Sequence, residues 1–312
     1  ASFVYRADAA TSERGVHDVS ISVRPGQVAV VCGRSGCGKS TLLRMANGLA
    51  PRFFPGRADG RVLLDGEEVG DLASWRVAER AGSLFQNPRT QFFNVDTTGE
   101  VAFALENAGW PSERIRARVE RTLRELGLED LADRSIFRLS GGQRQKIAYA
   151  SVWALRPPNL LLDEPTSNLD APSIADIAAF VANAKAAGRA VLVAEHRLAW
   201  LSGVADTYVH LDGGRVSRVM SAREFAALDP RELRTRYWGK RWGIVPQLPR
   251  AALSPVHRIG RQLIQRGIPG AHEGIARIGP RHHCRQVETF GQVHRHVLER
   301  MHGQLSPPVE QR

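Results

Sequence analysis

A glycine-rich turn that ends in a lysine and a serine is the first feature of the sequence that could do chemistry. Residues 33–40 read Gly-Arg-Ser-Gly-Cys-Gly-Lys-Ser, which fits the phosphate-loop pattern G-x-x-x-x-G-K-[ST], and they follow the apolar run Val28–Cys32. Glycines let backbone N–H groups converge on phosphate oxygens, and the positive end of a following helix attracts the same oxygens. We expect Lys39 to reach the β- and γ-phosphates of a nucleotide and the Ser40 hydroxyl to bind Mg²⁺. The residues expected to contact the nucleotide are Gly33, Arg34, Ser35, Gly36, Cys37, Gly38, Lys39, Ser40 and Thr41.

Two adjacent carboxylates stand at the end of a second apolar run. Leu160–Leu162 leads directly into Asp163 and Glu164, about 120 residues after the glycine-rich turn. An acidic pair after a strand is by itself more often a solvated turn, but behind a phosphate loop it supplies the second half of a nucleotide site. Asp163 is then expected to hold the Mg²⁺ shell, and Glu164 to accept the proton of the attacking water. The two motifs together predict a phosphate-loop NTPase.

The stretch Leu139–Gln143, which reads Leu-Ser-Gly-Gly-Gln, indicates the class of NTPase. It resembles the signature of ATP-binding-cassette (ABC) ATPases, in which the same five residues open a helix. The Ser140 hydroxyl and the backbone N–H groups at that helix N-terminus would bind an anion. In the family this anion is the γ-phosphate of an ATP on a second subunit, so the resemblance implies a head-to-tail dimer with two ATP molecules between the subunits. The residues expected to contact this ATP are Ser140, Gly141, Gly142 and Gln143.

Four further positions match the family's pattern in the expected order. Gln86 resembles the glutamine that contacts Mg²⁺ and senses the transporter, and His196 resembles the switch histidine that contacts the γ-phosphate. Asp170 ends a loop that meets the opposite subunit and its ATP. Tyr5 stands where the family places an aromatic ring under the adenine, although a lone aromatic near the N-terminus is as often core packing. The resemblance assigns catalysis to Glu164, His196, Lys39 and Gln86, and Mg²⁺ binding to Ser40, Gln86 and Asp163.

Finer features resemble the energy-coupling-factor (cobalt-type) ATPases of vitamin and metal-ion importers. These features are Leu84–Pro88 followed by Gln91, Glu100–Phe103 and Glu195–Leu198. In that subfamily a pair of ATPases, identical or different, drives a membrane scaffold protein, while a small membrane protein selects the substrate. The resemblance implies a cytoplasmic subunit, peripheral on the inner face of the membrane, whose partners are a second cassette and an integral-membrane component. The pair Ser167-Asn168 departs from the Ala-Gly of many relatives.

Two other functions stay open on the sequence. A non-transport ABC ATPase that acts on DNA or ribosomes would carry a long coiled coil or a second cassette behind a charged linker, and neither is visible. A regulatory cassette that no longer hydrolyses would lack catalytic residues, whereas every expected one is present. A transporter ATPase is therefore the preferred hypothesis. Phe92 and Phe93, just after Gln86, are candidate contacts to the membrane partner or, equally, core residues.

The elements that must position these groups are strands alternating with helices, which is typical of a mainly parallel sheet. Together with the resemblance, this predicts an α/β fold for residues 1–240. It consists of a RecA-like core sheet with helices on both faces, a helical signature subdomain at about 88–155 and a small N-terminal antiparallel β region. The predicted strands are Val28–Cys32, Arg61–Asp65, Leu160–Leu162 and Ala190–Ala194, and the second is expected to end in an Asp-Gly turn. The predicted helices are Thr41–Ala50, Ser112–Leu128, Gln143–Leu155 and Ile174–Ala187. The second has an apolar stripe at helical spacing, formed by Ile115, Val119, Leu123 and Leu126.

Charge separates residues 241–312 from the rest. The chain carries +11, with a mean hydropathy of −0.27 and no apolar run of the roughly 18 residues that a spanning helix needs. From Arg241 onward there are eleven Arg, no Lys and four Glu, so this segment alone carries +7. It also holds seven of the ten His and is predicted to be a poorly ordered tail, with metal binding and a shifted reading frame as the alternatives. We therefore expect no nucleic-acid partner, and three cysteines predict no disulfide framework.

Overall fold

The computed structural model describes residues 1–6, 14–167 and 169–228, which belong to the unit Ala1–Lys240. The predicted tail at 241–312 and its metal-binding alternative lie outside the described residues, as does Asn168. Within the three described ranges, none of the helices has the length and apolar character needed to span a bilayer.

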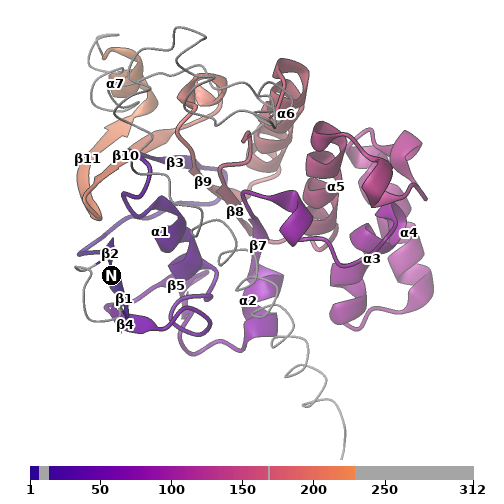
Figure 1. The fold of residues 1–312 in the computed structure, drawn as a ribbon, viewed down its shortest axis with the longest axis horizontal. Coiled ribbons are helices and arrows are strands. Elements are labelled where there is room, and N and C mark those ends of the chain that lie inside the picture. Colours follow the sequence, from indigo (N-terminus) through magenta and orange to yellow (C-terminus); the bar gives the residue numbers. More distant parts are fainter. Residues whose placement is uncertain (7–13, 168, 229–312) are drawn as a thin grey trace, which may run out of the picture. The chain divides into compact units, whose positions relative to one another are not determined.

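A six-stranded sheet forms the centre of this unit (Figure 1). Its strands lie in the order β11–β10–β3–β9–β8–β7, and all neighbours are parallel except β10 and β11. Strands covered on both faces should be apolar throughout, and β3 and β9 are buried at every residue. The sequence therefore predicted these central strands correctly. The six strands are β3 (Val28–Cys32), β7 (Ala81–Leu84), β8 (Asn159–Asp163), β9 (Ala190–Ala194), β10 (Thr207–Asp212) and β11 (Arg215–Ser221).

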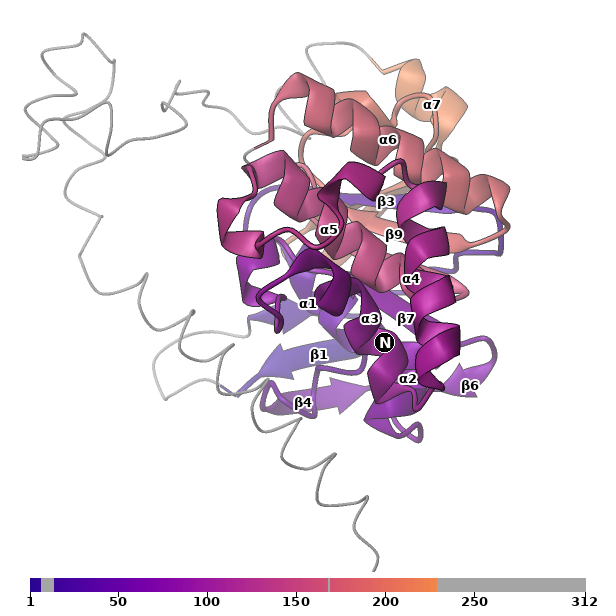
Figure 2. The same cartoon turned by 90° about the vertical axis from the view of Figure 1, so that its right-hand side faces the viewer.

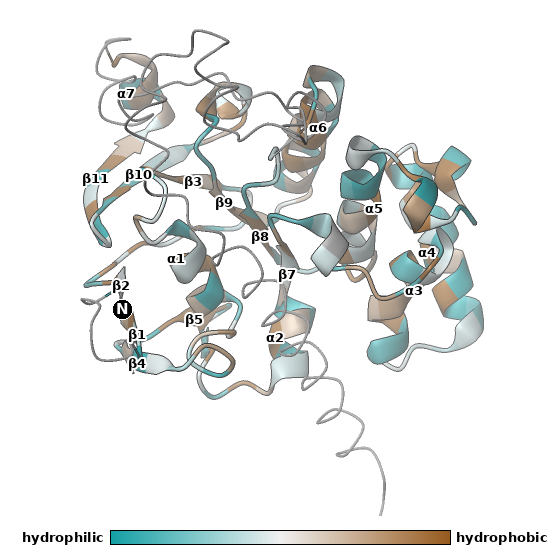
Figure 3. Ribbon diagram, in the orientation of Figure 1, coloured by the Kyte–Doolittle hydropathy of each residue, from teal (hydrophilic) through white to brown (hydrophobic). Residues whose placement is uncertain are grey.

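The two faces of this sheet bury separate hydrophobic cores, because successive strand residues point to opposite sides. Val28 and Val30 of β3 pack into one core with side chains of α5 (Gly141–Ala154) and α6 (Ala171–Ala186). Ala29 and Val31 pack into the other core with side chains of α1 (Lys39–Ala46). Figure 3 shows the central strands as predominantly hydrophobic. The predicted α/β class with helices on both faces is confirmed.

A smaller antiparallel sheet lies on the α1 side, with the strand order β2–β1–β4. Its strands are β1 (Ser2–Tyr5), β2 (Gly15–Val16) and β4 (Gly56–Asp59), and they are followed by a hairpin of β5 (Leu63–Leu64) and β6 (Glu67–Glu68). The predicted strand Arg61–Asp65 is thus wrong in extent. Asp65 and Gly66 both have positive φ, 51° and 85°, as a two-residue hairpin turn requires, so the expected Asp-Gly turn is confirmed.

A helical layer is formed by α3 (Thr97–Asn107), α4 (Ser112–Glu125) and α5 around a third hydrophobic core (Figure 2). In α4, Val119 and Leu123 are buried one turn apart, which agrees with the predicted apolar stripe. The short helices of this layer are η1 (Pro88–Thr90), η2 (Glu129–Leu131) and η3 (Ile136–Arg138). The remaining helices of the described residues are α2 (Ser74–Arg80), η4 (Leu198–Leu201) and α7 (Ala222–Ala226).

Helix ends differ from the predictions by a few residues, and caps explain the differences. Helix α1 begins at Lys39 and ends at Ala46, four residues before the predicted end, where Gly48 follows with a positive φ of 71°. Helix α5 begins at Gly141 rather than Gln143, because Ser140 caps it. Helix α6 begins at Ala171 rather than Ile174, because Asp170 caps it.

Candidate functional site

The glycine-rich turn joins β3 to α1, as its motif requires. Gly33 has φ 145°, and a Cβ there would lie 2.3 Å from the backbone oxygen of Leu211. Gly38 has φ 107° and occupies the N-cap of α1, where a Cβ would lie 2.6 Å from a methyl group of Val16. Both positions therefore exclude a side chain. Because Gly38 cannot cap α1, the first N–H groups of the helix stay available to an anion.

The ammonium of Lys39 lies inside this turn and is only 5% exposed. Its Nζ donates hydrogen bonds to the backbone oxygens of Gly33 at 3.1 Å and Arg34 at 3.4 Å, and it lies 3.9 Å from Oε1 of Glu164. The loop carbonyls thus accept hydrogen bonds from the buried ammonium that the phosphate-loop motif assigns to phosphate binding. A bound phosphate would give this cation a stronger partner than carbonyl oxygens do.

Ser40 and Asp163 form the second pair that the sequence predicts. The Ser40 hydroxyl, at the start of α1, donates to Oδ1 of Asp163 at 3.0 Å, at the end of β8. Burial raises the pKa of Asp163, and the hydrogen bond from Ser40 opposes that rise. A buried carboxylate beside a hydroxyl is a hard oxygen donor set, which fits Mg²⁺ when substrate phosphates complete the shell. Among the described residues there is no group of three or more His, Cys, Asp or Glu that could hold a metal.

Glu164 lies in contact with three other predicted site residues, Lys39, Gln86 and His196. Gln86 Nε2 donates to its Oε2 at 2.7 Å, and Nδ1 of His196 lies 3.7 Å from its Oε1. The interaction with His196 is the largest cause that lowers the pKa of Glu164, and the same contact is the largest cause that raises the pKa of His196. Glu164 also has a positive φ of 44°, which is uncommon for a residue with a side chain and is typical of functional sites. Its carboxylate is therefore ionised and held from several sides.

Tyr5 lies next to the far end of the phosphate loop. Its hydroxyl is 3.2 Å from Oγ1 of Thr41 and accepts a hydrogen bond from Arg44 at 3.0 Å. Its ring packs edge-to-face against Phe3 and Phe54, with centroids 4.8 and 6.3 Å away. Both interpretations of this ring, core packing and a platform for the adenine, agree with this position, so the adenine contact stays a prediction. Sequence reasoning missed Arg44, although its spacing of four residues from Ser40 places both on one face of α1.

The signature residues lie at the N-terminus of α5. Ser140 is exposed and accepts a hydrogen bond from the backbone N–H of Gln143 at 3.2 Å, while the Gln143 side chain accepts from the N–H of Ser140 in return. A Cβ on Gly142 would lie 2.1 Å from Oγ of Ser173 in α6. Asp170 accepts from the N–H of Ser173 at 3.0 Å, and the hydrogen bonds from Ser173 lower the pKa of Asp170. Two helix N-termini are thus packed together at this place.

The site residues therefore form two groups. Contacts join Lys39, Asp163, Glu164, Gln86 and His196 with the phosphate loop. Contacts through Ser173 join Gly142 of the signature with Asp170. Sequence reasoning missed Thr166, which is fully buried and donates to Glu195 at 3.2 Å. Its nearness to Glu164 in the chain was the only signal available.

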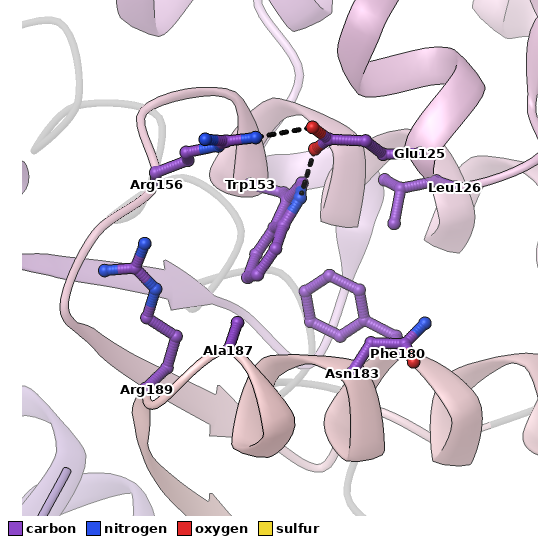
Figure 4. A pocket seen from close by; sticks show the side chains of 8 residues that line it. All are labelled: Glu125, Leu126, Trp153, Arg156, Phe180, Asn183, Ala187 and Arg189. Carbon is purple, nitrogen blue, oxygen red and sulfur yellow. Dashed lines mark hydrogen bonds and ion pairs between the residues drawn. The ribbon is translucent and has the colours of Figure 1, made fainter. Parts of the chain in front are cut away.

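A cavity of about 340 Å³ lies elsewhere in this unit (Figure 4). Arg156 and Arg189, at its rim, lie just before β8 and β9, whereas Asp163 ends β8 and His196 follows β9. The cavity is thus at the opposite edge of the sheet from the phosphate loop and is separate from the candidate site. The residues that line it are Glu125, Leu126, Trp153, Arg156, Phe180, Asn183, Ala187 and Arg189.

Comparison with known proteins finds ATP-binding subunits of ABC transporters. The family model described as ABC transporter matches residues 16–167. The chain is 38% identical over 219 residues to the nickel import ATP-binding protein NikO of Rhodobacter capsulatus, covering 68% of this chain and 85% of that protein. It is 41% identical over 162 residues to the energy-coupling factor transporter ATP-binding protein EcfA1 of Lactiplantibacillus plantarum, covering 52% and 56%.

Among solved structures, CbiO1 from Clostridium perfringens, part of the ABC transporter complex CbiONQ, has a similar fold. The TM-score is 0.64 at 26% identity, and the match covers 74% of this chain and 92% of that one. Other curated relatives are longer than this chain. It spans 46%, 42% and 36% of three ABC transporter ATP-binding proteins, two from Treponema denticola and one from Methanosarcina acetivorans.

Proposed function

Because this chain belongs to the ATP-binding-cassette family of transporter ATPases, we propose that it hydrolyses ATP at the Glu164 site and drives a membrane transporter. The observation that carries this proposal is the position of Glu164, an ionised carboxylate that accepts a hydrogen bond from Gln86 and lies 3.7 Å from Nδ1 of His196 and 3.9 Å from Nζ of Lys39. A general base must be ionised and must be held in place, and this carboxylate meets both conditions.

In the proposed reaction, the phosphate loop and the N-terminus of α1 hold the ATP phosphates, and Lys39 turns from the loop carbonyls to the β- and γ-phosphate oxygens. Ser40, Asp163 and Gln86 would hold Mg²⁺, which supplies positive charge against those oxygens. Glu164 accepts the proton of the attacking water as the bond to the γ-phosphorus breaks. His196, whose pKa is raised by Glu164, donates a hydrogen bond to the γ-phosphate.

A second cassette is needed to complete the site. The signature residue Ser140 is exposed, and among the described residues Gly142 beside it lies against Ser173 of α6. An exposed helix N-terminus with a hydroxyl at its cap is suited to bind the γ-phosphate of another subunit. We therefore assign Ser140, Gly141, Gly142, Gln143 and Asp170 to the ATP of a partner cassette, which can be an identical or a different chain.

An exposed apolar surface is the proposed contact to the membrane component. Phe93, Val95 and Phe137 are 37%, 65% and 78% exposed. They lie together because the N–H of Ile136 donates to the backbone oxygen of Val95, and Asp96 bridges to Ser135. Phe92 instead packs against two hydrophobic cores, so of the two aromatic candidates only Phe93 belongs to this surface. Large exposed apolar side chains that cluster in this way mark binding surfaces.

The transporter is proposed to be an importer of the energy-coupling-factor type, with a vitamin or a metal ion as cargo. This rests on the motifs around Gln86, Glu100 and Glu195, and on relatives named for nickel import, for an energy-coupling factor transporter and for the CbiONQ complex. In this arrangement the cassette lies on the cytoplasmic face of the membrane and never contacts the cargo.

Purification of the full chain from gently solubilised membranes tests the transport proposal. We expect an integral-membrane protein to co-purify, and Phe137→Ser to reduce its recovery without reducing basal ATPase activity. Val219→Ser is the matched control, because Val219 is 54% exposed but lies on β11, away from this surface. Equal recovery with both variants would contradict the proposed contact surface. Recovery of ribosomes or DNA in place of a membrane protein would overturn the transport role.

A further inference from the structure

A buried glutamate precedes the proposed switch histidine. Glu195 follows β9 directly and is 0% exposed. Its Oε1 accepts hydrogen bonds from the backbone N–H of Arg197 at 2.8 Å and from the Thr166 hydroxyl at 3.2 Å. The backbone of His196 lies between Glu195 and Arg197, so this one oxygen fixes the turn that presents His196. It also ties that turn to Thr166, two residues after Glu164.

The second oxygen of Glu195 has no such support. Oε2 is buried and has no hydrogen-bond partner within the part of the chain that the structure describes. A buried carboxylate oxygen without a partner is unfavourable, and burial accordingly raises the pKa of Glu195. Such an atom in a native protein calls for an explanation, and a partner that another state of the molecule supplies is one.

The signature helix α5 carries two buried polar groups of the same kind. Nε2 of Gln145 and the hydroxyl of Tyr149 are buried and also have no partner among the described residues. The two residues are four apart and so lie on one face of α5, and they are 2% and 3% exposed. Burial raises the pKa of Tyr149, and the negative charge of Glu195 is the second cause, which places the hydroxyl near that carboxylate; the neighbouring Gln145 side chain opposes the rise.

The unused groups are chemically complementary. Glu195 lacks a donor, whereas Gln145 and Tyr149 can each donate. Ser140 caps helix α5, so the helix that carries these donors also carries the signature that is proposed to bind the ATP of the partner cassette. A small displacement of α5 is enough to form or break a hydrogen bond, because hydrogen bonds weaken steeply with distance and angle.

We propose that Glu195 is a positioning residue for His196, and that the Tyr149 hydroxyl donates to its second oxygen when Ser140 engages the partner's ATP. Through this hydrogen bond, binding of the partner's ATP at the signature residues affects the position of His196 in the same chain. It rests on the proposed function, because that function assigns the roles of Ser140 and His196.

The test measures ATP turnover and thermal unfolding of Tyr149→Phe, on the full chain together with the partners that co-purify. A hydrogen bond to a charged group made only in the hydrolysing state corresponds to about a 10- to 100-fold change in rate. We expect kcat to fall by about tenfold or more with KM for ATP unchanged. The unfolding temperature should stay equal or rise, because the resting state loses only a hydroxyl without a partner.

Matched variants make the outcome decisive. Ser151→Ala removes another buried hydroxyl of α5, one that already donates to Ala148, and should leave kcat unchanged. In a Glu195→Gln background, Tyr149→Phe should lower kcat by a smaller factor than in the wild type, because the charged acceptor is absent. Wild-type kcat in Tyr149→Phe, or a loss of stability that accounts for its lower activity, would overturn the link. Glu164→Gln in the same assay separates the two proposals, because normal turnover there would remove the proposed site itself.

Discussion

Replacement of Glu164 by glutamine tests the centre of the proposed site most directly. The substitution keeps the shape of the side chain and the backbone, whose φ is 44°, but removes the charge that accepts a proton. The interaction with His196 lowers the pKa of Glu164, so the wild-type carboxylate is ionised at neutral pH and ready to act as a base. The amide of glutamine cannot take that role.

The expected magnitude follows from this role. A positioned general base contributes about 100- to 10,000-fold in rate, so kcat of Glu164→Gln should fall by about that factor. ATP binding should persist, because Lys39, Ser40 and the glycine-rich turn are unchanged and one negative charge near the phosphates is lost. We also expect ATP to trap Glu164→Gln as a closed dimer, because nothing removes the γ-phosphate.

The assay is phosphate release at saturating Mg-ATP, with nucleotide affinity measured separately and size-exclusion chromatography for the dimer. Glu120→Gln is the matched control, since Glu120 is exposed on α4 and far along the chain from the phosphate loop. A kcat within a few-fold of the wild type would remove Glu164 from the role of base. Loss of ATP binding with an intact fold would show instead that Glu164 serves binding.

Three further predictions follow from the same contacts. His196→Gln should cost more stability at pH 6 than at pH 9 in chemical unfolding. The pKa of His196 is raised above its ordinary 6.5, so the stability that its ion pair with Glu164 adds is complete below about pH 6.5 and is lost as the pH rises through the raised pKa. A loss of stability that does not depend on pH would contradict the ion pair. Gly142→Ala should lower the unfolding free energy by about 1–3 kcal/mol through overlap with Ser173, and Ser173→Gly should restore it; no rescue would refute the contact. Cys37 is 7% exposed and burial raises its thiol pKa, so iodoacetamide should label it slowly at neutral pH, and Mg-ATP should slow labelling further; equal rates with and without nucleotide, by mass spectrometry, would count against the placement of the loop.

The boundaries of the predicted strands show where the local sequence pattern was sufficient to define a strand. Val28–Cys32 and Ala190–Ala194 were predicted to the residue, because a strand buried on both faces is an uninterrupted apolar run. Arg61–Asp65 was too long, because only the pairing of Leu63 and Leu64 with β6 defines the strand there. Pairing is a property of two segments, and one segment's sequence does not contain it.

The aromatic pair after Gln86 shows what local pattern could not decide. Phe92 and Phe93 are the same residue type at adjacent positions, yet Phe92 enters two cores while Phe93 is 37% exposed. The buried Glu100 carboxylate accepts from the N–H groups of Phe93 and Asn94 and so holds this segment in place. Which ring is buried therefore depends on a contact six to seven residues along the chain and on the cores around it, and not on the residue type.

The sequence by itself determined the chemistry of the proposed site. The phosphate loop, the carboxylate pair and the signature are contiguous motifs, and each is read from residue types at fixed spacing because its backbone geometry is local. The tertiary structure decided which of these groups meet. It brings Gln86, Glu164 and His196 together from the ends of three strands, leaves Ser140 exposed at the N-terminus of α5, and buries one oxygen of Glu195 and the Tyr149 hydroxyl without partners among the described residues. Contacts of this kind depend on how the sheet and α5 pack, and packing is set by the whole chain and not by any single segment.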